Sequence, residues 1–251
     1  MSHTTTDANG VFVHEFASSL KTEADSDAAL RAAFGAFEHL DYRAHDAARK
    51  MGFDYILKSE DAQRIAVDDK ADTWLASSGN VSLELFTLSR RPAAEGWLFY
   101  SRAVALRYVS VKSGEVLVLP LDEVRAFVLP RLADFETVGV VNAPRGNFTH
   151  ITFNSLVPAS ELLAHCPGAS IVYLPGATGR LSRGISERVV PGQEAVSRLL
   201  HAGMYSRAAA GLGGPEMGYH VAANRHAAKQ REYLQQCRLP AGLALPEAAV
   251  A

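Results

Sequence analysis

Apolar residues after Asp27 recur at intervals of three and four, which is the spacing of one face of an α-helix. They are Phe34, Phe37, Leu40, Ala44, Ala48 and Met51. Ser26 or Asp27 can cap the start of such a helix, and Gly52 can end it. The pattern therefore predicts one amphipathic helix over residues 27–51. Glu38 lies on this predicted helix, beside its apolar face.

Two later segments alternate between apolar and polar residues, which is typical of β-strands. The first covers residues 64–72 and sets Ile65, Val67 and Ala71 against Arg64, Asp68, Lys70 and Asp72. The second covers residues 80–87 and sets Val81, Leu83 and Leu85 against Asn80, Ser82 and Glu84. The sequence Ser-Ser-Gly-Asn at 77–80 has strong turn chemistry. We therefore expect the two strands to form an antiparallel pair.

The rest of the chain alternates between short strands and short helices. Strands are expected at residues 53–58, 115–120, 147–153 and 170–176, and helices at 121–132, 157–167, 192–204 and 221–238. Pro130 should end the first of these helices. The order predicts an α/β fold with a central mixed β-sheet flanked by helices and a small C-terminal helical extension.

Composition changes this picture little. Apolar residues make up 48% of the chain, charged residues 21%, and the formal net charge is −2, as in an ordinary soluble globular protein. No run of 18 apolar residues predicts a membrane span, and the N-terminus lacks a basic and then apolar signal segment. Two cysteines exclude a disulfide framework. A cytoplasmic location is the expectation.

The balanced charge excludes a protein that coats nucleic acid non-specifically, so contact with DNA would need a local basic patch. The candidates are Arg90, Arg91, Arg102, Arg107 and Lys112. Scattered surface charge explains these five residues equally well.

The polar faces of the two predicted strands are rich in acidic residues. Asp68 and Asp72 flank Lys70 on one strand, and Glu84 interrupts the apolar run Leu83–Leu85 on the other. Carboxylates that converge repel each other, and Mg²⁺ or Mn²⁺, which take oxygen ligands, would relieve that repulsion. Such an ion activates water and stabilises charge on a phosphate. The alternative is a solvated strand face with a surface ion pair.

The segments "VDDKAD", "SSGNVSLEL" and "GWLFYSRAVALRYV" resemble the core of the PD-(D/E)xK nuclease superfamily, which has the restriction-endonuclease-like fold, and in particular its phage- and plasmid-borne members. The resemblance covers about residues 30–130. It implies Asp72 and Glu84 as metal ligands, with Asp68 as a competing ligand. It also implies Lys70 as the catalytic lysine and Glu38 as a contributing acid.

Together with the change of composition at both ends, the resemblance predicts a flexible arm over residues 1–25, a nuclease-like core over 26–185, and a helical extension and tail over 186–251. It implies a Mg²⁺- or Mn²⁺-dependent DNA endonuclease, and self-association is compatible with it because many proteins of this fold cut duplexes as homodimers. The family's usual lysine, two residues after the glutamate, is replaced by Phe86. Either Lys70 reaches the same space from the neighbouring strand, or the protein is an inactive, phage-encoded relative that binds nucleic acid or inhibits a host factor.

Overall fold

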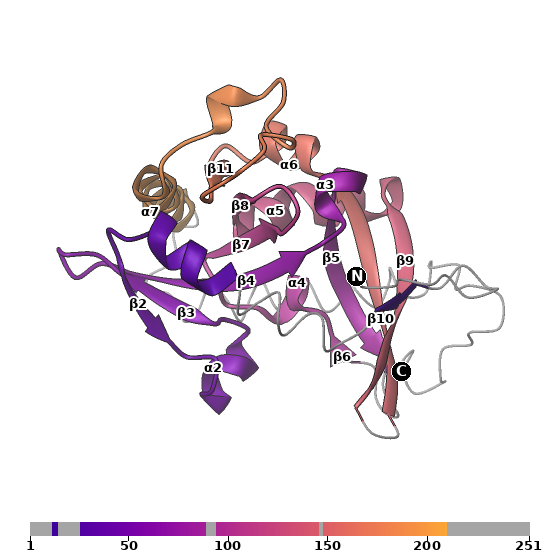
Figure 1. The fold of residues 1–251 in the computed structure, drawn as a ribbon. Coiled ribbons are helices and arrows are strands. Elements are labelled where there is room, and N and C mark those ends of the chain that lie inside the picture. Colours follow the sequence, from indigo (N-terminus) through magenta and orange to yellow (C-terminus); the bar gives the residue numbers. More distant parts are fainter. Residues whose placement is uncertain (1–11, 15–25, 89–93, 146–147, 210–251) are drawn as a thin grey trace.

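In the computed structural model, which describes residues 12–14, 26–88, 94–145 and 148–209, the strands form two separate β-sheets (Figure 1). The six-stranded sheet has the order β11 (Ser170–Tyr173), β8 (Glu115–Pro120), β7 (Ala105–Ser110), β4 (Arg64–Asp72), β3 (Tyr55–Lys58), β2 (Glu38–Asp41). The five-stranded sheet has the order β1 (Phe12–His14), β9 (Glu136–Arg145), β10 (Phe148–Pro158), β5 (Asn80–Leu88), β6 (Ala94–Glu95). In the six-stranded sheet β4 and β7 are parallel and the other neighbours are antiparallel, so this sheet is mixed.

Helices flank the sheets. Residues 26–33 are helical. The later α-helices are α2 (Asp46–Met51), α3 (Leu75–Ser78), α4 (Trp97–Tyr100), α5 (Leu121–Val128), α6 (Ala159–His165) and α7 (Gly192–Ala209). Two 3₁₀ helices are η1 (Leu129–Asp134) and η2 (Ser186–Arg188). The predicted α/β architecture with a mixed sheet flanked by helices is confirmed.

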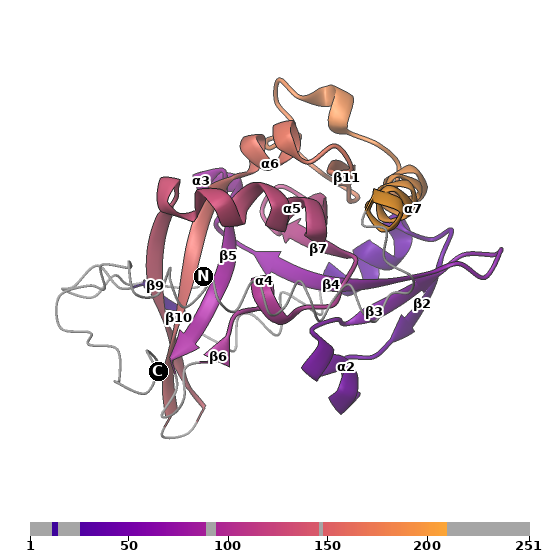
Figure 2. The same cartoon turned by 180° about the vertical axis from the view of Figure 1, so that it is seen from behind.

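Both faces of the six-stranded sheet are buried, and β7 lies at its centre. Ala105 and Val109 point to a cluster shared with helical residues 26–33 and with α7. Leu106 and Tyr108, which alternate with them, belong to a second cluster that includes residues of α5 and of the five-stranded sheet. Figure 2 shows α5 next to β7. Burial of each large apolar side chain contributes about 1.5–3 kcal/mol, so any polar group on this sheet needs a specific partner.

The single predicted helix over residues 27–51 is wrong. The helix at 26–33 stops before Gly35, residues 38–41 form β2, and a new helix, α2, follows. Pairing of β2 with β3 overrides the helical spacing of the apolar residues. Glu38 therefore lies on an outer strand and not on a helix. Gly52, with a φ of +66°, does end α2 as predicted.

The predicted antiparallel pairing of residues 64–72 with residues 80–87 is also wrong. Both strands exist, as β4 and β5, but they belong to different sheets. The connection is not a hairpin turn, because α3 redirects the chain from one sheet to the other. Gly79, with a φ of +72°, ends α3 and starts β5.

The strands at residues 53–58, 115–120, 147–153 and 170–176 are confirmed within a few residues, as are the helices near Leu121, Pro158 and Gly192. The predicted helix at 221–238 and most of the arm at 1–25 lie outside the described residues. Among the described helices, none is long and apolar enough to cross a membrane.

Candidate active site

Three consecutive charged residues in the middle of β4 point to opposite faces of the six-stranded sheet. Asp68 and Lys70 share one face, and Asp69 lies on the other. Asp68 is only 3% exposed, and Lys70 Nζ donates a hydrogen bond to its Oδ1 at 2.6 Å. Asp68 Oδ2 is buried as well, yet no described residue donates a hydrogen bond to it. One oxygen of this carboxylate is therefore left with its hydrogen-bonding capacity unused.

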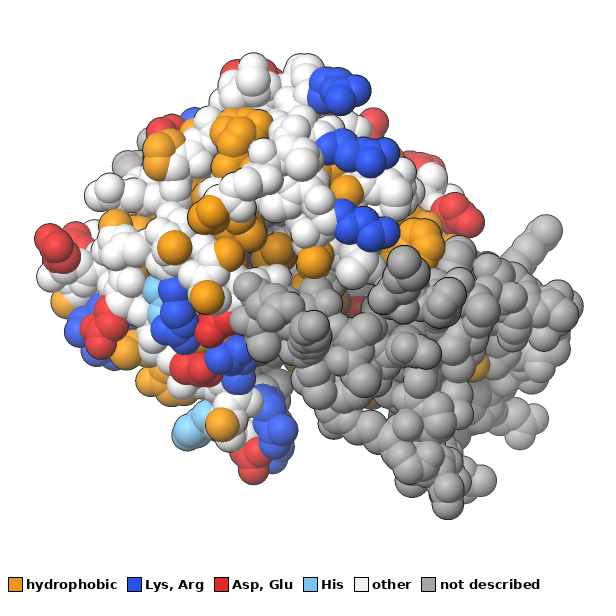
Figure 3. All heavy atoms as spheres, viewed as in Figure 1, with side chains coloured by type: hydrophobic (Ala, Val, Ile, Leu, Met, Phe, Trp, Pro, Cys, Tyr) orange, Lys and Arg blue, Asp and Glu red, His pale blue; other side chains and the backbone are white. Residues whose placement is uncertain are grey.

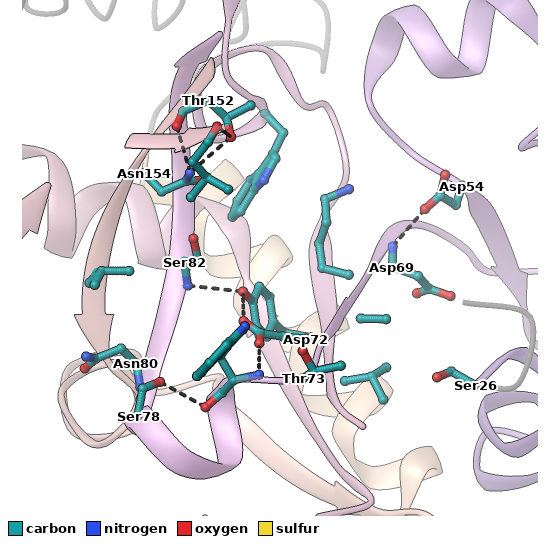
Figure 4. A pocket seen from close by; sticks show the side chains of 18 of the residues that line it. Ser26, Asp54, Asp69, Asp72, Thr73, Ser78, Asn80, Ser82, Thr152 and Asn154 are labelled. Carbon is teal, nitrogen blue, oxygen red and sulfur yellow. Dashed lines mark hydrogen bonds between the residues drawn. The ribbon is translucent and has the colours of Figure 1, made fainter. Parts of the chain in front are cut away.

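Asp54 supplies a second carboxylate beside this pair. It directly precedes β3, and its backbone N–H donates to the Val67 carbonyl at 2.9 Å, which extends the ladder with β4. Its side-chain Oδ2 accepts a hydrogen bond from the Asp69 N–H at 3.0 Å. Two backbone-anchored contacts thus fix Asp54 against β4 (Figure 4).

Burial and mutual charge shift the pKa values of these groups. Burial raises the pKa of Asp68 to about 7; the Lys70 ammonium opposes that rise and the charge of Asp54 adds to it. Burial alone would lower the pKa of Lys70, but Asp68 and Asp54 together raise it, so the ammonium stays protonated. One cation therefore serves two carboxyl groups, and the local excess of negative charge would be relieved by a proton held between Asp68 and Asp54 or by a further cation.

Glu84 approaches the same region from the other sheet. It lies on β5 and accepts a hydrogen bond from Thr87 Oγ1 at 2.7 Å. Burial is the main cause of a raised pKa at Tyr100, and the charges of Asp68, Glu84 and Asp54 raise it further, whereas Lys70 lowers it. The four charged groups therefore act on one phenol at the end of α4.

Gly96 brings α4 against β5 and so helps to place these groups. Its N–H donates to the Leu85 carbonyl at 2.8 Å. A Cβ at this position would lie 2.3 Å from the Glu84 carbonyl oxygen, a clash with backbone that has no room to move. Only glycine permits this approach, which sets Trp97 and Tyr100 next to the charged groups.

A cavity of about 630 Å³ lies between the two sheets, and two of the charged groups, Asp54 and Lys70, line one end of it, whereas Asp68 and Glu84 are not among its lining residues. Asp54, Asp69 and Lys70 line that end. The opposite wall comes from β5, β9 and β10, with polar and apolar side chains interspersed (Figure 4). A ligand in this cavity would contact both sheets at once, which is the usual position of a binding site between packed elements.

Asp72 has a structural task that sequence analysis did not anticipate. Its Oδ1 accepts hydrogen bonds from the N–H groups of Trp74 and Leu75 and so caps α3. Its Oδ2 accepts from the Tyr108 hydroxyl at 2.7 Å, and that hydroxyl accepts from the Ser82 N–H at 3.1 Å. Asp72 and Tyr108 thus connect β4 to β5 across the two sheets, and both oxygens of Asp72 are engaged.

The remaining predicted acid, Glu38, lies away from the other site residues. It is on β2, two strands from β4, and pairs with Lys58 at 2.8 Å on the surface. Among the described residues, no group of three or more His, Cys, Asp or Glu side chains is arranged to hold a metal ion. The structure therefore brings Asp68 and Lys70 together with Asp54, places Glu84 where its charge acts on the same Tyr100 phenol, and leaves Glu38 outside.

The five predicted phosphate contacts differ widely in exposure. Arg107 is 1% exposed and forms a bidentate pair with Asp69, with Nε–Oδ1 and Nη2–Oδ2 distances of 2.7 and 2.6 Å. Arg102 and Lys112 are exposed. Arg90 and Arg91 lie outside the described residues. Figure 3 shows basic side chains along the upper right edge of the described surface and mixed charges at the lower left.

Sequence analysis missed Asp54. The available signal was weak, since it consisted of one aspartate directly before the apolar strand "YILK". Its partner Asp68 was considered only as a competing ligand, although it is the most deeply buried acid of the three consecutive charged residues. The apolar neighbours Val67 and Ala71 in "AVDDKA" indicate that β4 is a central strand, where an acidic residue is expensive to bury.

No family model matches this chain, and comparison with curated proteins and with solved structures found no match either. The functional assignment therefore rests on the geometry of the site.

Proposed function

We propose that this protein is a metal-dependent DNA endonuclease whose catalytic centre is formed by Asp54, Asp68 and Lys70, with Glu84 nearby on β5 of the other sheet. The single observation that carries the proposal is the buried Asp68–Lys70 pair with Asp54 beside it and one oxygen of Asp68 unsatisfied. A buried carboxylate is destabilising unless it is paired or binds a cation, so this arrangement suits function better than stability.

The spacing of these residues supports the family resemblance in a corrected register. The superfamily is named after an aspartate followed, further along the chain, by an acidic residue one position removed from a lysine. Asp54, then Asp68 and Lys70 flanking Asp69, fit that order. The lysine then lies two residues after the second acid, as is usual in the family, and Phe86 does not replace a catalytic lysine. Asp72 leaves the centre because both its oxygens are used elsewhere.

Mg²⁺ or Mn²⁺ fits the donor set. Asp68 Oδ2 and the carboxylate of Asp54 are hard oxygen ligands of the kind these ions prefer. When bound, the ion would polarise the phosphate and lower the pKa of a coordinated water.

The side chains themselves have separable tasks. Asp68 holds Lys70, and Lys70 keeps its proton, so its ammonium acts as a hydrogen-bond donor that orients the attacking water or balances charge on the phosphate. Asp54, held by the Asp69 N–H, supplies a carboxylate of fixed orientation. Glu84, on β5, adds negative charge to the same region.

The test is incubation of purified protein with plasmid and linear duplex DNA, in Mg²⁺ or Mn²⁺ and in EDTA. Cleavage that requires metal and is lost in Asp54→Asn, Asp68→Asn and Lys70→Met supports the proposal. Glu38→Gln is the matched control, because Glu38 is an exposed acid that forms a similar lysine pair on β2. If Glu38→Gln abolishes cleavage while Asp54→Asn does not, the assignment of the centre is wrong.

A second candidate is an inactive nuclease-fold protein that binds nucleic acid or blocks another protein. The observation that favours it is the lack, among described residues, of three clustered metal-ligand side chains. Metal-independent DNA binding without cleavage, unchanged in Asp68→Asn, would support this candidate over the enzyme. Sedimentation of either form would show whether it is a homodimer.

A further inference from the structure

The cavity next to the charged groups has aromatic side chains in positions suited to a planar ligand. Trp97 is nearly buried at the start of α4, and Lys70 Nζ lies 5.9 Å from its ring centroid. Trp74, between β4 and α3, also lines the cavity but is 45% exposed. Two indoles, one deep and one at the rim, therefore line a cavity that also contains Lys70 and Asp54.

The wall formed by the five-stranded sheet carries amide and hydroxyl groups. Asn80 and Ser82 come from β5, and Thr152 and Asn154 from β10 (Figure 4). Asn154 is 7% exposed, and its Nδ2 donates to the Thr152 carbonyl at 3.3 Å, which fixes the orientation of the amide. Such groups can donate to and accept from the edge of a heterocycle, whereas they offer little to a hydrocarbon.

Positive charge lies at the rim. Lys112, in the turn between β7 and β8, places its ammonium 5.4 Å from the ring centroid of Trp74. Arg43 lines the cavity from the other side. A ligand with a planar polar ring and an attached phosphate matches this combination of indole, amide and cation.

We propose that the cavity binds one unpaired nucleobase of a DNA strand, stacked on Trp74 and Trp97, so that the preferred substrate carries unpaired nucleotides next to the cleaved bond. The proposal rests on the proposed function for the chemistry at Lys70, and it adds the class of substrate. A paired base cannot enter, because its hydrogen-bonding edge is used by the opposite strand and its faces by its neighbours.

Binding to DNA of one sequence in three forms tests the proposal: single strand, matched duplex, and duplex with an internal unpaired bubble. Each carries 2-aminopurine at one position, and binding is measured in EDTA so that cleavage does not occur. We expect the single strand and the bubble to bind about tenfold more tightly than the duplex, since stacking of one base on an aromatic side chain is worth about that factor. 2-Aminopurine fluorescence should be quenched only when this base is unpaired.

Two variants assign the effect to the cavity. Trp74→Ala should remove the preference for unpaired DNA and leave duplex affinity within about twofold, because only the stacking surface is lost. Tyr173→Ala is the matched control, since Tyr173 is 43% exposed on β11 and is not among the residues that line the cavity. Lys112→Ala should weaken binding of all three forms by a similar factor, because a phosphate contact does not depend on pairing.

The outcomes separate this proposal from the proposed function. Equal affinity for duplex and bubble, or a preference that survives Trp74→Ala, overturns the base-binding cavity even if the protein cleaves DNA. A preference that Trp74→Ala removes supports it even if no DNA is cleaved. Tighter binding to RNA of the same sequence than to the single DNA strand overturns the assignment to DNA.

Discussion

The two faces of β4 show how neighbouring aspartates can have different tasks. On one face Asp69 gives both oxygens to the guanidinium of Arg107, which lies 5.1 and 5.5 Å from the ring centroids of Phe34 and Tyr55. On the other face Asp68 gives one oxygen to Lys70 and leaves the second unused beside Asp54.

The two ion pairs differ in how many oxygens of the carboxylate are already hydrogen-bonded. In the Asp69 pair, the Arg107 guanidinium is 1% exposed and packs among apolar and aromatic side chains, so the pair holds β4 against β7, although Asp69 itself also lines the cavity. The Asp68 pair has an open cavity next to Lys70. An ion pair that satisfies both carboxylate oxygens suits a structural task, whereas one that leaves an oxygen unsatisfied while its lysine lines a cavity is suited to binding.

The largest expected effect is on catalysis, from Asp68→Asn. We expect a loss of metal-dependent cleavage of about 10³-fold or more, because both the ligand and the partner of Lys70 change. Stability at pH 8 should fall by less than in Asp69→Asn, because Lys70 is 31% exposed and keeps Asp54 as a charged neighbour. The folded-state pKa of Asp68, about 7, lies above its unfolded value, so the ionised carboxylate opposes folding above pH 7 and asparagine removes that opposition. Cleavage rates and urea unfolding at pH 8 measure the two effects. A large loss of stability with retained cleavage would show that Asp68 has a structural task and does not take part in cleavage.

The next effect is on stability, from Asp69→Asn. The change leaves the Arg107 guanidinium buried without a charged partner, which should lower the free energy of unfolding by about 3–5 kcal/mol. Thermal and urea unfolding measure it, with Arg43→Gln as the control, because Arg43 is 42% exposed and forms a surface ion pair with Asp41. An Asp69→Asn protein as stable as Arg43→Gln would show that the Asp69–Arg107 ion pair contributes little to the free energy of unfolding.

The sequence predicted the existence of β4 and β5 but not their relation. Alternation of apolar residues identifies a strand and its faces, and this succeeded at both segments. It does not identify the partner strand, because pairing depends on the path of the connection. Here Asp72 caps α3 and directs the chain into the second sheet, an interaction that looks like an ordinary turn in the sequence.

The site was predicted in part for the same reason. Lys70, Asp68 and Glu84 were recognised from their charge on apolar strands. Asp54 was not, because its contribution depends on the β3–β4 ladder that brings it to the Asp69 N–H. Asp72 was overvalued, since a carboxylate that caps a helix and one that binds a metal have the same sequence signature.

A smaller effect is expected from Asp72→Ala, which separates the capping carboxylate from the centre. Loss of the α3 cap and of the Tyr108 hydrogen bond should lower the free energy of unfolding by about 2 kcal/mol. Cleavage by the folded protein should fall by less than about tenfold, in contrast to Asp68→Asn. A loss of cleavage equal to that of Asp68→Asn, with no change in the midpoint of urea unfolding, would indicate that Asp72 is a metal ligand.

The smallest expected effect concerns His39, which lies near Arg107 on the side of the sheet that carries Asp69. Burial is the main cause that lowers the pKa of His39 to about 4, and the charge of Arg107 lowers it further. The unfolded chain, with a histidine pKa of about 6.5, takes up a proton as the pH falls below that value, whereas the folded protein does not until near pH 4. Stability should therefore fall between pH 7 and pH 5, by about 1 kcal/mol after allowance for solvent screening at a partly exposed ring.

Urea unfolding of the wild type and of His39→Gln at both pH values measures this loss. His39→Gln should be less sensitive to acid, whereas His165→Gln, a change at an exposed ring paired with Glu161, should keep the wild-type dependence. If His39→Gln loses as much stability as the wild type, the acid sensitivity arises elsewhere. If His39→Gln loses no stability between the two pH values, the face of β4 that carries Asp69 depends on a histidine that must stay neutral. The face that carries Asp68 depends on a lysine that must stay charged.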